Sequence, residues 1–267
     1  AAVARLRRRR DVTRRVGDRE QELEPRPAAG RAVHGDVAAR AAHELDVQVL
    51  ALTGPNAPLA ELARVCRFHD ALLVVDDAHG IGVLGPEGRG SVAEAGLSEE
   101  DVPVLIGTLG KGVGTSGAFV AGPSLLMDYL VQKARTYIYT TAMPPALAMA
   151  TISSLDLIER DQGRREHVLG LVSRFRREAS AMGYELMPSH TPIQPIMVGD
   201  NHDALALSQA LEERGLLVSA IRPPTVPAGE ARLRVTFSAA HSQANLDCLL
   251  TALSDCRHLV QKADMAV

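Results

Sequence analysis

Lys111 is the residue whose setting most clearly suggests chemistry. It lies in residues 108–117 (TLGKGVGTSG), downstream of residues 74–80 (VVDDAHG). A lysine at the end of an apolar strand is costly unless it is exposed, paired or covalently bound, because desolvating an ammonium costs several kcal/mol. Burial would also lower the pKa of the amine, as a nucleophile that later carries a proton requires. The pattern therefore predicts a lysine that holds pyridoxal phosphate as a Schiff base. An ordinary lysine in a glycine-rich turn is the alternative.

Asp76 and His79 fit the same cofactor. Its pyridine nitrogen must stay protonated to accept electrons, and a carboxylate at the end of a strand, here Asp76, stabilises that proton. His79 could hydrogen-bond to the phenolic oxygen of the ring, or it could be a loop histidine that satisfies backbone groups. Thr108 could place its hydroxyl on the phosphate, and the neighbouring glycines would let the backbone approach a planar ring closely.

Two nucleotide-binding motifs are rejected. Residues 80–85 (GIGVLG) match the dinucleotide pattern GxGxxG, but the Pro86-Glu87-Gly88 that follows cannot easily begin the helix that would receive a pyrophosphate. Residues 107–112 are no Walker A loop, because the glycine spacing is wrong and Gly112 stands where a hydroxyl would bind the metal.

Composition excludes several classes of protein. The 267 residues are 46% hydrophobic and only 3% aromatic, with no Trp and a net charge of -3, which argues against nucleic-acid binding. No apolar run is long enough to span a membrane and no signal-peptide pattern opens the chain, so we predict a cytoplasmic protein with no membrane partner. The odd number of cysteines, at 66, 248 and 256, favours reduced thiols over disulfides, and the spacing suggests no metal site.

The chain divides into three segments. Residues 1–45 are rich in arginine with interspersed acidic residues, and we expect them to be solvated or poorly ordered rather than a nucleic-acid arm. Because the chain begins with Ala rather than Met, we expect it to be a fragment. Residues 46–160 alternate strands and helices in an α/β pattern, and residues 161–267 form a C-terminal α+β domain.

Individual elements are predicted from apolar periodicity and from the Gly and Pro residues between them. Strands are expected at residues 47–52, 72–76, 104–108, 118–121, 193–198, 218–221 and 232–238. Helices are expected at residues 58–69 and 123–135, from residue 144 or 145 to about 159, and at residues 167–182, 202–214 and 243–260.

Four motifs occur in the order seen in the α-oxoamine synthases, and the chain resembles that family from about residue 57 onward. The motifs are residues 75–80 (VDDAHG), 108–112 (TLGKG), 139–145 (YTTAMPP) and 231–236 (ARLRVT). These enzymes have the fold-type I pyridoxal phosphate transferase fold, like aspartate aminotransferase. The resemblance implies that residues 46–160 are a remnant of the large domain and that the small domain follows.

The resemblance also implies roles for individual residues. Lys111 matches the Schiff-base lysine, Asp76 the pyridinium partner and His79 the histidine at the ring oxygen. Arg234 matches the arginine that holds the amino-acid carboxylate, with Arg232 as its nearest competitor. The remaining matches are Thr108, a phosphate or ring contact, and Thr140 and Thr141, which reach the cofactor of the neighbouring subunit and so imply a homodimer.

The implied reaction is a decarboxylative condensation. Residues 193–201 (IQPIMVGDN) and 220–229 (AIRPPTVPAG) look most like the branch that joins L-alanine to a pimeloyl thioester, of CoA or of a carrier protein. The product is 8-amino-7-oxononanoate, an intermediate in biotin biosynthesis. Glycine C-acetyltransferase or another condensation of the family is one alternative, and an inactive fragment or pseudoenzyme is another. The long N-terminal part of the family is not recognisable in residues 1–45, and Ala51 stands where the family has serine. We therefore expect weak stability and little or no catalysis.

Overall fold

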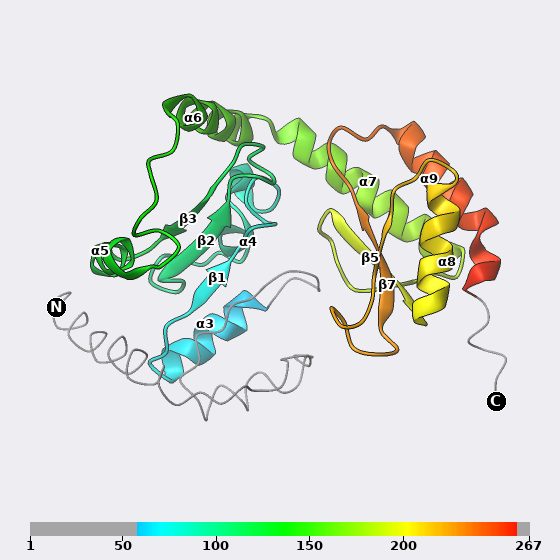
Figure 1. Ribbon diagram of the computed structural model, residues 1–267, viewed down its shortest axis with the longest axis horizontal. Helices are drawn as coiled ribbons and strands as arrows, with labels where there is room; N and C mark the ends of the chain where they lie inside the picture. Colours follow the sequence, from blue (N-terminus) through cyan, green and yellow to red (C-terminus); the bar gives the residue numbers. More distant parts are fainter. Residues whose placement is uncertain (1–57, 261–267) are drawn as a thin grey trace. The chain divides into compact units, whose positions relative to one another are not determined.

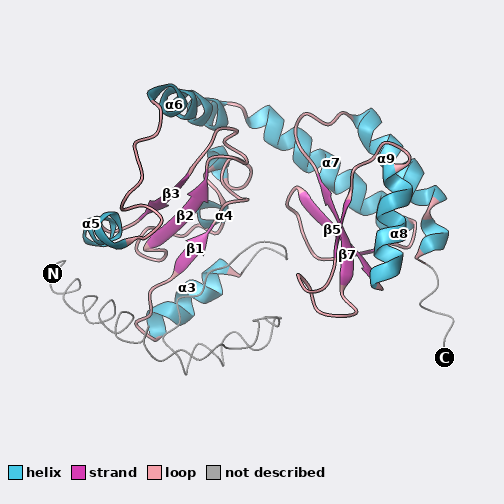
Figure 2. Ribbon diagram, in the orientation of Figure 1, coloured by secondary structure: helices cyan, strands magenta, loops and turns pink. Residues whose placement is uncertain are grey.

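The computed structural model describes residues 58–260, all of which fall within one compact unit, Gly35–Val267. The segment 1–45 and the strand predicted at 47–52 lie outside the described residues. The described elements form two sheets, each with its own helices (Figures 1 and 2).

The first sheet has the strand order β1-β2-β3. Strand β1 (Val74–Asp76) pairs in parallel with β2 (Val104–Thr108), and β2 pairs antiparallel with β3 (Ala118–Ala121). Helix α3 (Leu59–Phe68) precedes β1 and packs apolar side chains, Leu59 among them, against this sheet. A parallel pair needs a crossover connection, and here it carries two short elements, the 3-10 turn η1 (Pro86–Gly88) and helix α4 (Ser91–Glu94). The carboxyl ends of β1 and β2 therefore lie at the same edge of the sheet.

Two helices follow this sheet, α5 (Ser124–Lys133) and α6 (Pro145–Arg160). Helix α6 begins with proline at its first position, where the missing N–H costs no hydrogen bond. Neither helix has a fully buried residue. Large apolar side chains are exposed on both helices and on the segment between them: Leu125, Tyr129, Val131, Tyr137, Ile138, Tyr139, Met143, Met149, Ile152, Leu155 and Leu157.

The second sheet is antiparallel, with the strand order β4-β5-β7-β6. Its strands are β4 (Glu185–Leu186), β5 (Ile193–Gly199), β6 (Ser219–Ile221) and β7 (Ala231–Thr236), and its helices are α7 (Gln162–Ala181), α8 (Asn201–Glu212) and α9 (Gln243–Asp255), followed by the turn η2 (Arg257–Leu259).

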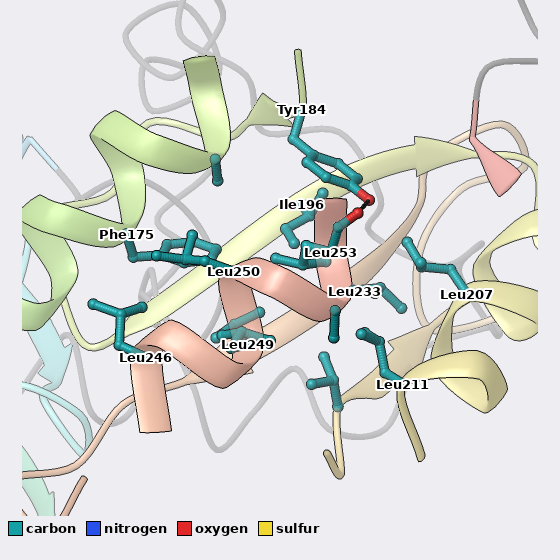
Figure 3. Packing of buried hydrophobic residues seen from close by; sticks show 14 of the residues in the cluster. Phe175, Tyr184, Ile196, Leu207, Leu211, Leu233, Leu246, Leu249, Leu250 and Leu253 are labelled. Carbon is teal, nitrogen blue, oxygen red and sulfur yellow. Dashed lines mark hydrogen bonds between the residues drawn. The ribbon is translucent and has the colours of Figure 1, made fainter. Parts of the chain in front are cut away.

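A continuous apolar core joins these helices to the second sheet (Figure 3). Phe175 of α7, Leu207 of α8, Ile196 of β5, Leu233 of β7 and Leu253 of α9 are each completely buried. Complete burial of such a side chain contributes about 1.5–3 kcal/mol to stability. This core holds β7 in place. It therefore also fixes the positions of the side chains that alternate along that strand.

The predicted elements within residues 58–260 are observed, with differences at the ends of strands and helices, such as the strand predicted at 232–238, which spans Ala231–Thr236. The short elements η1, α4 and β4 were not predicted. The strands at 104–108 and 118–121 have the predicted bounds. Helix α7 begins at Gln162 rather than at residue 167, because the Asp161 side chain accepts a hydrogen bond from Arg164 N and caps the helix there. The helix predicted to run to residue 260 ends at Asp255 and gives way to η2. The division near residue 160 coincides with the junction between α6 and α7 and stays a prediction.

Over residues 58–260, no helix combines the length and the apolar character that a membrane span requires. The cysteines Cys66, Cys248 and Cys256 are all free.

Candidate active site

Parallel pairing brings the turns after β1 and β2 together. Asp76 lies opposite Ile106 in the register, and Asp77 N donates to Ile106 O at 2.9 Å, which extends the ladder by one residue. Beyond it, Ala78 N donates to Asp76 Oδ1 at 3.0 Å, and Thr108 Oγ1 donates to Ala78 O at 3.4 Å. Asp76 and Thr108 therefore flank one small region of backbone at the ends of two paired strands.

The turn that carries Lys111 is closed by its own hydrogen bonds. Leu109 N donates to Gly117 O at 2.9 Å, and Thr115 N donates to Leu109 O at 2.7 Å. Helix α6 holds the turn from one side, since Thr151 Oγ1 lies 3.0 Å from Thr115 Oγ1 and Ser154 Oγ donates to the carbonyl of the buried Val113. The position of Lys111 is thus fixed by the backbone on both sides of it.

Lys111 meets His79 across the two turns. Lys111 Nζ lies 3.1 Å from His79 Nε2. Of the alternatives for such a lysine, exposed, paired or covalently bound, the structure shows Lys111 exposed. The reason is local: the turn extends beyond the end of β2, and Val113 rather than Lys111 is the side chain that packs inside it.

His79 is in a positively charged environment. Burial lowers the pKa of His79 below its ordinary value, and the charges of Lys111 and Arg234 lower it further, while Asp76 opposes them. The imidazole is therefore neutral near pH 7, so Nε2 can accept a hydrogen bond from Lys111 Nζ. A neutral imidazole next to an amine can serve as a hydrogen-bonding partner for a ligand in this site.

Arg234 and Arg232 have different surroundings, although they lie two positions apart on β7. Both point away from the core, because Leu233 between them is buried in it. Arg232 is 7% exposed, and its guanidinium bonds to the carbonyl and carboxylate of Glu230 and to Met187 Sδ. Among residues 58–260, the Arg234 side chain has no hydrogen bond or ion pair, and its charge acts on His79. Arg234 is therefore the arginine that can bind an anion here.

Two of the glycines around Lys111 are required by the protein's own packing or backbone. A Cβ on Gly112 would lie 2.4 Å from Ile81 O, so this glycine permits close contact between the two turns, while the predicted approach of the backbone to a ring stays a prediction. Gly114 has φ of +71°, a conformation that glycine adopts without strain.

Asp77 is the residue that the sequence analysis missed. It is 4% exposed, and its carboxylate accepts hydrogen bonds from Ser91 N at 2.7 Å and from Ser91 Oγ at 2.6 Å. Desolvation raises the pKa of this carboxyl, and the bonds from Ser91 oppose the rise. In space, the glycines at positions 80 and 90 lie on either side of this carboxylate. Their presence was the only sequence feature that could have indicated the buried position of Asp77.

Thr140 and Thr141 are not brought to the other predicted residues. Both are exposed on the segment before α6, and Thr140 Oγ1 donates to Tyr137 O at 2.6 Å. Their predicted role, in the site of a neighbouring subunit, stays a prediction.

The donor set fits pyridoxal phosphate. Lys111 provides an exposed amine that an aldehyde can reach, Asp76 a carboxylate for a ring nitrogen, and His79 an imidazole for a ring oxygen. The Thr108 hydroxyl, whose bond to Ala78 O is long at 3.4 Å, can turn to a phosphate, and Arg234 can take a carboxylate. Within residues 58–260 no group of His, Cys, Asp and Glu side chains could hold a metal ion.

Comparison with known proteins gives a family. Residues 42–253 match the model of the aminotransferase class I and II family. An 8-amino-7-oxononanoate synthase of Marinobacter nauticus is 67% identical over 242 residues, which are 87% of this chain and 61% of the relative. One of Pseudomonas putida is 59% identical, over 81% of this chain and 55% of the relative. The chain thus spans little more than half the length of these relatives.

Solved structures agree with this result. Serine palmitoyltransferase of Sphingomonas wittichii superimposes with a TM-score of 0.76 at 30% identity, over 84% of this chain and 59% of its own. An 8-amino-7-oxononanoate synthase of Francisella tularensis gives a TM-score of 0.65, also at 30% identity, over 74% of this chain and 57% of its own. Another serine palmitoyltransferase structure, with a TM-score of 0.75 at 30% identity over 84% and 59% of the two chains, contains pyridoxal phosphate.

Proposed function

The chain belongs to the aminotransferase class I and II family, among its α-oxoamine synthases, and from that premise we propose that it takes part in forming 8-amino-7-oxononanoate from L-alanine and a pimeloyl thioester. The names of its relatives at 67% and 59% identity support this reaction. The observation that carries the proposal is the 3.1 Å contact of Lys111 Nζ with His79 Nε2, at the carboxyl ends of two parallel strands and beside Asp76.

Pyridoxal phosphate is the cofactor of the α-oxoamine synthases. When bound, it supplies an aldehyde that condenses with amines and a protonated ring that accepts electron pairs from the substrate carbon. In our proposal Lys111 holds it covalently, Asp76 keeps its ring nitrogen protonated, and His79 and Thr108 hydrogen-bond to its ring oxygen and phosphate.

Arg234 binds the carboxylate of L-alanine in this proposal. A guanidinium forms two parallel hydrogen bonds to a carboxylate, which fixes the orientation of the amino acid as well as its position. The absence of a side-chain partner for Arg234 within residues 58–260 supports this role, since no side-chain bond to these residues has to break first.

Lys111 moves the proton in this proposal. Once the amine of L-alanine has replaced Lys111 on the cofactor, the freed Nζ would take the proton from the α carbon and later return one to the product, which needs an amine with a fixed position and an accessible lone pair. The neutral His79 beside it accepts a hydrogen bond from Nζ and so orients the amine, without competing for the positive charge.

We also propose that the chain forms a homodimer through the surface that carries Thr140 and Thr141. Tyr139 is 91% exposed, and apolar side chains continue along α5 and α6 on either side of it. Several large apolar side chains exposed on one stretch of chain are typical of a protein interface. Sedimentation of the wild-type chain and of Tyr139→Asp tests it: a dimer that dissociates in the variant supports the proposal, and a wild-type monomer contradicts it.

A turnover assay tests the reaction. The chain is incubated with pyridoxal phosphate and L-alanine together with pimeloyl-CoA or a pimeloyl carrier protein, and the product is identified by mass spectrometry. A product with the mass of 8-amino-7-oxononanoate that is absent with Lys111→Ala supports the proposal. A product only from glycine and acetyl-CoA would instead identify a glycine C-acetyltransferase. No product in any arm, with the cofactor bound, would identify a non-catalytic chain.

A further inference from the structure

The Asp77 carboxylate occupies a closed space between two stretches of backbone. A Cβ on Gly80 would lie 2.1 Å from Asp77 Oδ1, and a Cβ on Gly90 would lie 2.1 Å from Asp77 Oδ2. Real atoms do not approach so closely, so the carboxylate fills the room that side chains at positions 80 and 90 would need. Gly80 has no positive φ, and space alone therefore requires glycine there.

The same residue holds the turn that carries His79. Asp77 O accepts hydrogen bonds from Gly80 N at 3.1 Å and from Ile81 N at 3.2 Å. Together with the two bonds from Ser91, Asp77 thus connects the turn after β1 to the beginning of α4. His79 lies inside the loop that these bonds close.

The connection continues to the Lys111 turn. Between Gly80 and Ser91 the chain folds back on itself, with Gly82 N bonded to Gly88 O and Gly90 N bonded to Leu84 O, both at 2.8 Å. This folded loop places Gly82 against Gly112, where a Cβ on Gly82 would lie 3.1 Å from the Gly112 carbonyl carbon. The loop that Asp77 anchors therefore packs directly against Gly112, the residue after Lys111.

We propose that Asp77 is a positioning residue of the active site, whose buried carboxylate sets the place of His79 directly and that of Lys111 through the loop 80–91. The catalytic importance of this positioning rests on the proposed function, whereas the positioning itself rests only on contacts within this chain. Asp77 touches neither Lys111 nor His79 through its side chain, so it acts through the backbone that it fixes.

The titration of His79 reports this positioning without any cofactor. The charged groups that act on His79 are Lys111 and Arg234, which lower its pKa, and Asp76, which raises it. Removing the negative charge of Asp77 could by itself only lower the pKa of His79, since a carboxylate favours imidazolium. Loosening the turn would raise the pKa of His79, because it would expose the imidazole to water and separate it from the positive charge of Lys111.

The test is an NMR titration of His79 in Asp77→Asn, with the resonance assigned from its loss in His79→Gln. We expect the midpoint of His79 to rise toward its ordinary value. Asp101→Asn is the matched control, because Asp101 accepts the same pair of bonds from Ser98, from its N and its Oγ, both at 3.0 Å, away from the site. In that variant the midpoint of His79 stays at its wild-type value.

A midpoint in Asp77→Asn that is unchanged or lower overturns the proposal. If Asp77→Asn does not fold, Ser91→Ala decides, because it removes only the hydroxyl bond to the carboxylate: a raised midpoint supports positioning, and an unchanged one overturns it. Labelling of Lys111 by pyridoxal phosphate is then measured in the folded variants, where a loss of up to about a hundredfold in rate is expected for a displacement near 1 Å. Failure of the wild-type chain to be labelled would contradict the proposed function and leave the titration result standing.

Discussion

Substitution by alanine should have different effects at the two glycines that flank Lys111, disturbing the site at Gly112 and leaving it unchanged at Gly110. In Gly112→Ala the new Cβ would lie 2.4 Å from Ile81 O, whereas an unstrained carbon–oxygen contact is about 3.3 Å. The Lys111 turn must therefore move by about 0.9 Å relative to the turn that carries His79. In Gly110→Ala the nearest atom, Thr115 O, is 3.7 Å from the new Cβ, which is an ordinary contact that requires no movement.

The displacement acts directly on the site. The Lys111 Nζ to His79 Nε2 distance is 3.1 Å, so a shift of about 0.9 Å takes the pair to about 4 Å, beyond hydrogen-bonding range. Overpacking of this kind costs about 1–3 kcal/mol of stability. A misplacement of about 1 Å lowers the rate of a positioned reaction by up to about a hundredfold.

The assay is the rate at which pyridoxal phosphate and borohydride label Lys111, followed by peptide mass spectrometry, with thermal unfolding measured on the same samples. Gly112→Ala should label slowly and unfold at a lower temperature. Gly110→Ala should label at the wild-type rate, with a change in stability within about 0.5 kcal/mol. Equal rates in the two variants would refute the reasoning, because the close contact with Ile81 O exists at position 112 and not at position 110.

Three further predictions concern the second sheet and its core. Arg234→Lys should raise the KM for L-alanine by about 10-fold to 100-fold at nearly constant kcat, because a bidentate bond is lost, whereas Arg232→Lys should lower the melting temperature and leave that KM unchanged. Tyr184→Phe should cost about 1 kcal/mol in denaturant unfolding, because the 2.8 Å bond from Tyr184 Oη to Leu253 O is lost (Figure 3). Burial raises the pKa of Tyr184 from 10.0 to about 12, so the wild-type chain, unlike Tyr184→Phe, should lose stability as the pH rises from 10 toward 12. Phe175→Ala should destabilise the chain by about 3–5 kcal/mol in the same unfolding assay, because the completely buried ring leaves a cavity.

Much of the fold was predictable because it depends on local patterns. The strand at 104–108 is a short apolar run between turns, and Pro144 and Pro145 mark the start of helix α6 in the sequence. The start of α7 was missed because residues 162–166 (QGRRE) have no apolar periodicity. Arg165 in that stretch is buried, and its guanidinium donates hydrogen bonds to Gln162 Oε1 and to Ile158 O. A hydrophobic pattern does not predict a buried arginine.

The site was predictable where it depends on residue type and not where it depends on distant contacts. The meeting of His79 with Lys111 follows from parallel pairing of β1 with β2, which the alternating pattern favours. The exposure of Lys111 could not be predicted, because it depends on the path of the turn beyond β2. Nor could the role of Asp77, whose partner Ser91 lies across a folded loop, since in the sequence Asp77 looks like a second copy of Asp76.

The covalent hold of Lys111 on pyridoxal phosphate is the central claim, and the chain is well suited to test it because it has only three lysines, Lys111, Lys133 and Lys262. The measurement is mass-spectrometric location of the label after incubation with pyridoxal phosphate and borohydride reduction. We predict that the label is found on Lys111, persists in Lys133→Arg and disappears in Lys111→Arg. A label spread over the three lysines in proportion to their exposure, or one that survives in Lys111→Arg at the wild-type level, would contradict the claim.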